Sequence, residues 1–439
     1  YRVARSIVQC IPRNPSGWAG AAATGRYRDE AAALSALDLG TLDWVDLIPL
    51  PRRVARTVDL VTDVRVDYLP SAGVALGQLR LLLSLLRRNH LFGDLIAGAP
   101  TATHAANDQL NALAAEVETS QDLRDAFEDP DTAGLLRFVR TDSGASDFRQ
   151  HFAEFIDRYG HRETSSLLLV HDPTWRDAPA TVLDLIRVLR AGGDLVEERE
   201  SRASAALTGV LDHRVVRRFH AAPLVRRLVS RAAAGIALRE DTHYEATRLM
   251  PVVRHVVNEA GLRLAQAGTL ARSDDVWFLT WPEVAAAPDP DSAEHCSTSL
   301  QEISDRRRQA HSELAATPLI ATSTLYPDRR FAEDTLVSGT AAGGGRVVGP
   351  VRVVHDSSEF AQLRPGDVLV CLATNPSWTP LFARAAAVVV DHGGLASHAA
   401  IVAREYGIPA VMGTGNGTSV LHDEEQVQVD GAAGTVTHG

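Results

Sequence analysis

The stretch VVVDHGGLASHAAIVAREYGIPAVMG, residues 388–413, joins a strand pattern to a glycine turn, a helix and a second strand. The apolar run that ends at Val390 predicts a buried strand. Gly393 and Gly394 then allow backbone conformations and close approaches that a Cβ would block. A helix that begins at Ser397 would present its unpaired N–H groups at this turn. Such a helix start is a ready anion-binding site.

His398 follows Ser397 at this predicted helix start. An imidazole of near-neutral pKa can attack phosphorus through a ring nitrogen and keep the phosphoryl group beside N–H donors. His392 is nearby but precedes the glycines, so we predict His398 as the reactive histidine. Gly393, Gly394 and Ser397 are the predicted phosphate-binding residues. The alternative is a histidine that merely caps a helix in an ordinary α/β domain.

The run GGLASHAAIVAREYGIPAV, residues 393–411, closely resembles the phosphohistidine motif in the swivelling domain of PEP-utilising enzymes and ATP-dependent dikinases. This resemblance implies that His398 is phosphorylated and carries the group between two sites. The segment TNPSWTPLF, residues 374–382, also resembles that family and is expected to lie close to the phosphohistidine loop.

The spacing of apolar residues divides the chain into a helical part and a part with short strands. Apolar residues at three- and four-residue spacing predict helices at 29–37, 52–64, 71–98, 103–118, 147–159, 180–190, 195–211, 224–234 and 238–266. Short strand patterns follow at 347–354, 367–372, 386–390, 410–412, 426–429 and 435–437.

These patterns predict a multidomain protein. A mainly α-helical, substrate-binding (acceptor) domain covers 1–318, and a small α/β (β/β/α) swivelling phosphohistidine domain covers 346–439. The segment 319–345, with proline and a GTAAGGG run, predicts a flexible linker between them.

Three parts of the helical region extend the resemblance. FIDRYGHRE at 155–163 with PTWRDAP at 173–179, and REDTHY at 239–244, are similar to the substrate-binding domain of rifamycin phosphotransferases and their dikinase relatives. Arg239 matches an arginine of that family. His243 stands where the family carries a lysine, so it is a weaker fixed cation, although it can accept a hydroxyl proton.

Phosphoryl transfer to an alcohol needs cations for the transferring oxygens and a group that positions or deprotonates the hydroxyl. Arg239 and His243 are four residues apart and share a helix face. We predict these two residues, with His398, as the catalytic groups; a solvated helix face is the alternative. The predicted substrate-binding residues are His161, Arg162, Trp175 and Trp277.

The composition excludes several classes of site. All 44 basic residues are arginine, so neither a P-loop nor an ATP-grasp nucleotide site can form with its usual lysine. We therefore expect no tightly bound cofactor on this chain, and ATP with Mg²⁺ on a separate or missing ATP-grasp domain. The three cysteines have no metal-binding spacing, so we predict no metal site and a cytoplasmic location.

Charge and hydropathy limit the partners. The net charge of −11 argues against nucleic acid, and the longest apolar run, 79–86, is too short and too charged to span a membrane. The expected partners are an ATP-grasp domain or subunit and a small-molecule hydroxyl acceptor.

No barrel domain follows His398 in this sequence, so the pyruvate-handling branch of the family lacks its acceptor site. The sequence therefore predicts a phosphotransferase component that passes a phosphoryl group from ATP, through His398, to a hydroxyl of a small, partly apolar molecule such as an antibiotic or a biosynthetic intermediate. One alternative is a phosphocarrier subunit of a PEP-dependent system. Another is a non-catalytic helical binding module that keeps a vestigial swivelling domain.

Overall fold

The computed structural model describes residues 14–97, 99–129, 131–162, 170–171, 173–190, 195–290, 298–314, 334–375, 378–394 and 397–439. The chain divides into two compact units. The first consists mainly of the described parts of Arg65–Tyr244 and Asp328–Gly439, and the second of those of Ala19–Val64 and Glu245–Pro327. The predicted domain boundaries stay a prediction, and residues 319–333, which are most of the predicted linker, lie outside the described residues.

The second unit is helical. Its apolar core joins Tyr27, Leu47 and Val54 to Val256 and Leu264, and all five side chains are buried. Its elements are α2 (Ala22–Ser35), η2 (Leu39–Thr41), α3 (Trp44–Leu47), the first part of α4 (Leu50–Leu85), α14 (Met250–Gln266), η5 (Ser273–Phe278), α15 (Trp281–Ala285) and α16 (Thr298–Leu314).

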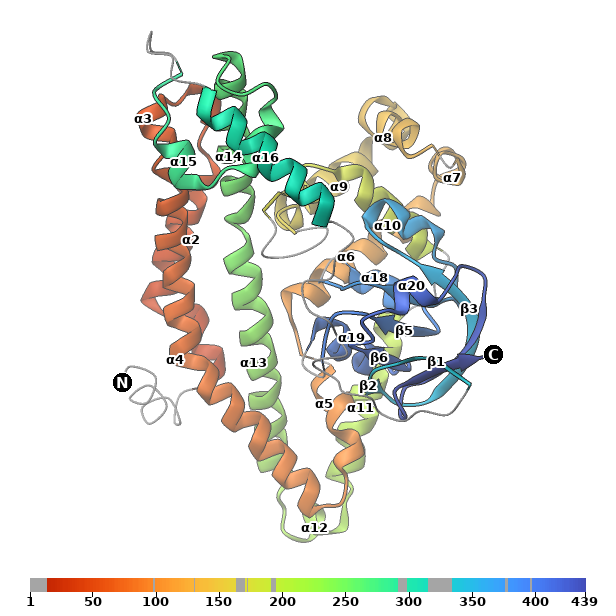
Figure 1. Ribbon diagram of the computed structural model, residues 1–439. Coiled ribbons are helices and arrows are strands. Elements are labelled where there is room, and N and C mark those ends of the chain that lie inside the picture. The colour runs from red at the N-terminus through yellow and green to blue at the C-terminus, as the bar shows by residue number, and fades with distance from the viewer. Residues whose placement is uncertain are drawn as a thin grey trace. The chain divides into compact units, whose positions relative to one another are not determined.

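The first unit combines helices with one sheet, which is drawn in blue in Figure 1. Its helical elements begin with η1 (Pro15–Gly20) and the rest of α4. They continue with η3 (Asn89–Leu91), α5 (Phe92–Ala97), α6 (Ala102–Val117), α7 (Gln121–Glu128), α8 (Thr132–Thr141), η4 (Ser143–Ala145), α9 (Ser146–Tyr159), α10 (Pro179–Arg190), α11 (Leu195–Leu211), α12 (Arg214–Arg218) and α13 (Ala222–Thr247).

Two predicted helix breaks are absent, and two helices predicted as continuous are divided: 71–98 after Leu85, where α4 ends, and 238–266 between Thr247, the end of α13, and Met250, the start of α14. Pro70 lies inside α4 and does not separate two helices, since the buried stripe of Val64, Ala72 and Leu79 continues across the proline at eight- and seven-residue spacing, about two helical turns each. α13 also continues through Gly235. A Cβ there would lie 3.0 Å from the Cβ of Ala72, so the glycine allows close helix packing and does not mark a stop.

The sheet contains eight strands in the order β1-β8-β7-β3-β4-β5-β6-β2. Strands β3 to β6 run parallel, and the remaining pairs are antiparallel. Their bounds are β1 (Thr335–Ser338), β2 (Thr340–Gly343), β3 (Arg346–Val353), β4 (Val368–Cys371), β5 (Ala387–Val390), β6 (Ala410–Met412), β7 (Gln426–Asp430) and β8 (Thr435–His438). The six predicted strands are present. The end of the predicted linker is not a loop, because β1 and β2 pair with β8 and β6.

The parallel strands support the helix that carries His398. β5 is fully buried and pairs with β4 and β6, with Val389 opposite Val411. α19 (His398–Tyr406) packs against β2, β5 and β6. The remaining helical turns near the sheet are η6 (Ser357–Gln362), α18 (Thr379–Phe382) and α20 (Gly417–Val420). The structure confirms a mainly helical region followed by a small α/β domain.

An apolar core and a buried carboxylate stabilise this part of the first unit. A continuous apolar core runs from α6, α9 and α10 to η6, α18 and α19, because α10 packs directly on η6 and α18. At the end of β5, the buried carboxylate of Asp391 accepts hydrogen bonds from the N–H and hydroxyl groups of Thr418, the hydroxyl of Thr414 and the N–H of Gly417. The glycine-rich segment 413–417 is therefore a structural turn.

Candidate active site

The helix start at His398 has the local structure that the sequence predicted. Ser397 is the N-cap residue, and its Oγ accepts a hydrogen bond from the N–H of Ala400 at 3.3 Å. Gly393 has φ +154°, a conformation that L side chains rarely adopt. Gly407 ends the helix in the left-handed region with φ +69°.

Both ring nitrogens of His398 face a threonine hydroxyl. Thr374 Oγ1 lies 3.3 Å from Nδ1, and Thr379 Oγ1 lies 3.3 Å from Nε2. The ring of Phe382 packs edge-on at a centroid distance of 6.4 Å. Thr374, Thr379 and Phe382 of the segment 374–382 thus lie against the histidine, as the resemblance of that segment implied. Whichever nitrogen receives a phosphoryl group, a hydroxyl beside it can donate to a phosphoryl oxygen.

The surroundings of His398 favour its neutral form. Burial, followed by repulsion from Arg162, from His243 when it is protonated, and from Arg239, lowers the pKa of His398 to about 3. A neutral imidazole keeps a lone pair on one nitrogen, and that lone pair is what attacks phosphorus. The guanidinium groups of Arg162 and Arg239, which oppose protonation, would equally attract a dianionic phosphoryl group.

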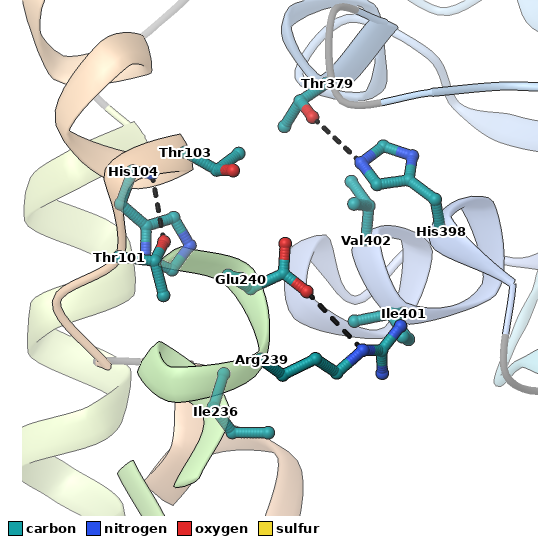
Figure 2. A pocket seen from close by; sticks show the side chains of 10 residues that line it. All are labelled: Thr101, Thr103, His104, Ile236, Arg239, Glu240, Thr379, His398, Ile401 and Val402. Atoms are coloured by element: carbon teal, nitrogen blue, oxygen red, sulfur yellow. Dashed lines mark hydrogen bonds and ion pairs between the residues drawn. The ribbon is translucent and has the colours of Figure 1, made fainter. Parts of the chain in front are cut away.

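His398 faces a small cavity that two distant stretches of the helical region complete (Figure 2). Arg239 and Glu240 reach the cavity from α13, and their side chains form an ion pair at 3.8 Å. The residues that line the cavity are Thr101, Thr103, His104, Ile236, Arg239, Glu240, Thr379, His398, Ile401 and Val402.

The two residues predicted from the REDTHY segment differ in position. Arg239 lines the cavity with His398, whereas His243 lies one turn further along α13 and does not appear among the described lining residues. Burial and the charges of Arg65, Arg162 and Arg239 lower the pKa of His243 to about 4. His243 is therefore neutral near pH 7, and it does not supply the fixed positive charge of a lysine.

Arg162 connects the predicted substrate-binding residues to the cavity wall. Its side chain is only 5% exposed, and Nη2 donates to Oγ1 of Thr103 at 3.0 Å. Its guanidinium lies 5.7 Å from the ring centroid of Trp175. His161 packs edge-on against Tyr244 at 4.6 Å. Trp175 and His161 are thus core residues behind the wall, and their role in binding stays a prediction.

Trp277 belongs to the second unit. It lies in η5, where its indole N–H donates to Oδ1 of Asn258 at 3.1 Å. The predicted role of Trp277 in acceptor binding stays a prediction.

Sequence reasoning missed most of the wall opposite His398. Glu240 is adjacent to Arg239, yet Thr101, Thr103 and His104 come from the beginning of α6, more than 130 residues earlier in the chain. One local signal was present: Thr101 is the N-cap of α6, and its Oγ1 accepts from the N–H of His104 at 3.1 Å. That signal predicts a helix start but does not place it opposite His398.

Within the described ranges, no three or more His, Cys, Asp or Glu side chains are grouped so that they could hold a metal ion. In the same part of the chain, each helix is too short or too polar to traverse a bilayer.

Comparison with protein families identifies the two parts that form this cavity. Residues 363–434 match the mobile domain of PEP-utilising enzymes, and residues 67–240 match the fourth domain of rifampicin phosphotransferase. The chain thus combines a mobile domain of the PEP-utilising type with a helical domain of the rifampicin phosphotransferase type, which confirms the resemblance drawn from the sequence.

Individual relatives agree with this assignment. The chain is 30% identical over 374 residues to the uncharacterized phosphotransferase YvkC of Bacillus subtilis, covering 80% of this chain and 43% of the relative. It is 30% identical over 315 residues to a rifampicin phosphotransferase of Streptomyces sviceus, covering 67% of this chain and 35% of the relative. A phosphoenolpyruvate synthase of Pseudomonas aeruginosa is 50% identical over 99 residues, covering 23% of this chain and 12% of the relative. The chain spans less than half the length of these curated relatives.

Proposed function

We propose that this chain is a phosphotransferase component in which His398 carries a phosphoryl group and passes it to a hydroxyl of a small, partly apolar molecule. The observation that carries this proposal is the cavity that the neutral imidazole of His398 and the side chain of Arg239 both line. A phosphoryl group on His398 would share this cavity with a guanidinium that can bind its oxygens. A hydroxyl bound in the same cavity would be within reach of phosphorus.

The source of the phosphoryl group lies outside this chain in our proposal. The sequence has no lysine, so its residues do not fit a nucleotide site of the P-loop or ATP-grasp type. ATP with Mg²⁺ bound to an ATP-grasp domain or subunit would supply the group. The extra length of the relatives, of which this chain covers less than half, leaves room for such a domain.

The lining of the cavity supports the acceptor class. Ile236, Ile401 and Val402 supply apolar surface, and Thr101 and Thr103 supply hydroxyls. Such a lining suits a ligand held by apolar burial and oriented by a few polar groups. We propose a hydroxylated antibiotic or a biosynthetic intermediate of that kind, and rifampicin, which two relatives act on by name, is the first compound to test.

A phosphocarrier of a PEP-dependent system is the second candidate. It is favoured by the 50% identity to a stretch of phosphoenolpyruvate synthase. In that case the phosphoryl group on His398 would pass to pyruvate on a partner protein, and the cavity at Arg239 would have no acceptor role. The two candidates therefore differ in whether Arg239 affects the second transfer.

The first experiment asks whether His398 carries the group. Phosphoramidate phosphorylates imidazoles without an enzyme, and mass spectrometry of the peptide that contains residue 398 would report an acid-labile phosphoryl group. The His398→Ala variant should lack this label. A full level of label in that variant, at the same peptide, would overturn the assignment. Rifampicin added to the labelled protein should then gain phosphate while the label disappears.

A further inference from the structure

The first unit has a tip where the end of α4, helix α12 and the beginning of α13 lie together (Figure 1). We call residues 85–90 and 213–227 the α12 tip. A closed apolar core lies beneath it, in which Leu86, Val216 and Val225 are buried in one cluster. The backbone of the α12 tip is therefore held in place by side chains that point inward, and the side chains that point outward have no part in this core.

Three large apolar side chains of the α12 tip are exposed to solvent. Leu85 is 74% exposed, Phe219 is 73% exposed and Leu224 is 54% exposed. Leu85 and Leu224 each adjoin a buried residue of the core along the chain, so their exposure does not come from a frayed helix end. Single exposed apolar residues are common on protein surfaces, but a group of them marks a surface that binds a partner.

The α12 tip is also strongly basic, although the whole chain has a net charge of −11. It contains no Asp or Glu. Its exposed arginines are Arg87, Arg88, Arg214, Arg217, Arg218, Arg226 and Arg227. Elsewhere arginines bind carboxylates, as Arg190 and Arg263 bind glutamates at 2.6 Å and 2.7 Å. Among the residues that the structure describes, no arginine of the α12 tip forms such an ion pair, so its positive charge is uncompensated.

This combination of side chains fits the surface of an anionic membrane. A protein segment at such a surface buries Phe and Leu side chains at the level of the headgroups, while arginines bind lipid phosphates. The sequence places both kinds of side chain together, because Phe219 follows two arginines and Leu224 precedes two others. A nucleic acid would bind the arginines but would leave the three apolar side chains in water. The core of a protein–protein interface, by contrast, is depleted of charged residues.

We propose that the α12 tip binds the surface of a membrane that contains anionic lipids. Leu85, Phe219 and Leu224 enter the headgroup region, and the surrounding arginines bind lipid phosphates. Binding of this kind needs no helix that spans the bilayer. It is also independent of the function proposed above, because the α12 tip shares no residue with the cavity at His398.

Co-sedimentation of the full chain with lipid vesicles tests the proposal. Vesicles of phosphatidylcholine alone are compared with vesicles of an equal mixture of phosphatidylcholine and phosphatidylglycerol. We expect binding to the mixed vesicles only, and we expect this binding to weaken as the salt concentration rises. Polyglutamate, added in the absence of vesicles, serves as a probe for an acidic protein surface.

Two sets of variants separate the charged from the apolar contribution. Arg217→Gln combined with Arg218→Gln should weaken binding to the mixed vesicles roughly 20-fold, because each arginine near an anionic surface contributes about a fivefold gain in affinity. Phe219→Ser should weaken it roughly tenfold, because the ring no longer enters the headgroup region. Arg52→Gln combined with Arg56→Gln, and Val45→Ser, change exposed side chains of the second unit and are the matched controls.

Each outcome decides the proposal. Loss of binding in the α12-tip variants, with wild-type binding in both controls and unchanged circular dichroism, supports it. A chain that does not bind the mixed vesicles overturns it, as does an equal loss in the controls. Wild-type binding by Phe219→Ser overturns the entry of apolar side chains into the headgroup region and leaves only electrostatic attraction. Tight binding of polyglutamate without binding of vesicles overturns the membrane assignment in favour of an acidic protein surface.

Discussion

The two sides of the cavity are built in different ways. The His398 side comes from one continuous region, in which the segment 374–382, strand β5 and helix α19 follow each other along the chain. The opposite side comes from the beginning of α6 and the middle of α13, which are separated by more than 130 residues. A reactive residue that depends on local structure can be found from a motif. A wall assembled by helix packing cannot.

Removing the positive charge of the opposite wall should have the largest effect. Arg239→Ala takes away the guanidinium that lines the cavity together with His398, so we expect transfer from phospho-His398 to an acceptor to slow by roughly 10²-fold, while the formation of phospho-His398 is unchanged. Decay of the preformed label with added methanol measures this step. Arg226→Ala, at an exposed arginine of the same helix, is the control. Equal decay rates in both variants would place the acceptor elsewhere and favour the PEP-dependent candidate.

On the His398 side, two adjacent glycines should respond differently to the same change. Gly393 has φ +154°, and an added Cβ would lie 3.0 Å from the Oγ of Ser397. Gly393→Ala should therefore lower the free energy of unfolding by about 1–3 kcal/mol. A Cβ at Gly394 meets no heavy atom of the described residues within 4 Å, so Gly394→Ala should change the free energy of unfolding by less than about 1 kcal/mol. Urea unfolding measures the loss of stability in each variant. Equal losses in the two would show that the turn does not require a glycine at 393.

The two threonines beside His398 should show which nitrogen carries phosphate. A threonine hydroxyl that donates to a phosphoryl oxygen contributes a charge-assisted hydrogen bond. Replacing the relevant threonine, in Thr374→Val or Thr379→Val, should slow phosphorylation of His398 by about tenfold. The other variant serves as its control. If neither substitution alters the rate of labelling by phosphoramidate, the hydroxyls have no part in holding the phosphoryl group.

The smallest effect concerns stability and pH. The pKa of His243 is about 4 in the folded chain, below the ordinary value of 6.5, so the unfolded state binds more protons between these values. The free energy of unfolding should fall as pH falls from 7 to 5, and His243→Gln should remove roughly 1–2 kcal/mol of that decrease. Urea unfolding at both pH values measures the change, with His90→Gln as the control. An unchanged slope in His243→Gln would mean that its ring is not shielded from protonation.

The sequence predicted the His398 side because its signals are local. Ser397 at the N-cap and Gly407 in the left-handed region determine the ends of α19 through contacts within a few residues. Pro70 and Gly235 misled the prediction, because continuous packing overrides their usual tendency to break a helix. The beginning of α6, with Thr101, Thr103 and His104, was missed for a related reason. Its place on the cavity wall depends on helix packing that brings α6 opposite α19, and no short motif encodes that arrangement.

The buried carboxylate of Asp391 limits how far the phosphohistidine motif could be transplanted into another protein. A graft of residues 388–413 would carry His398, Ser397 and both glycines, but it would leave Asp391 without the donors it takes from 414–418. The graft would also lack Thr374 and Thr379, the two hydroxyls beside the ring. The shortest fragment that keeps these contacts therefore runs from β3 to β8. It begins with β3 because this strand pairs with both β4 and β7, and it ends with β8 because β8 pairs with β7.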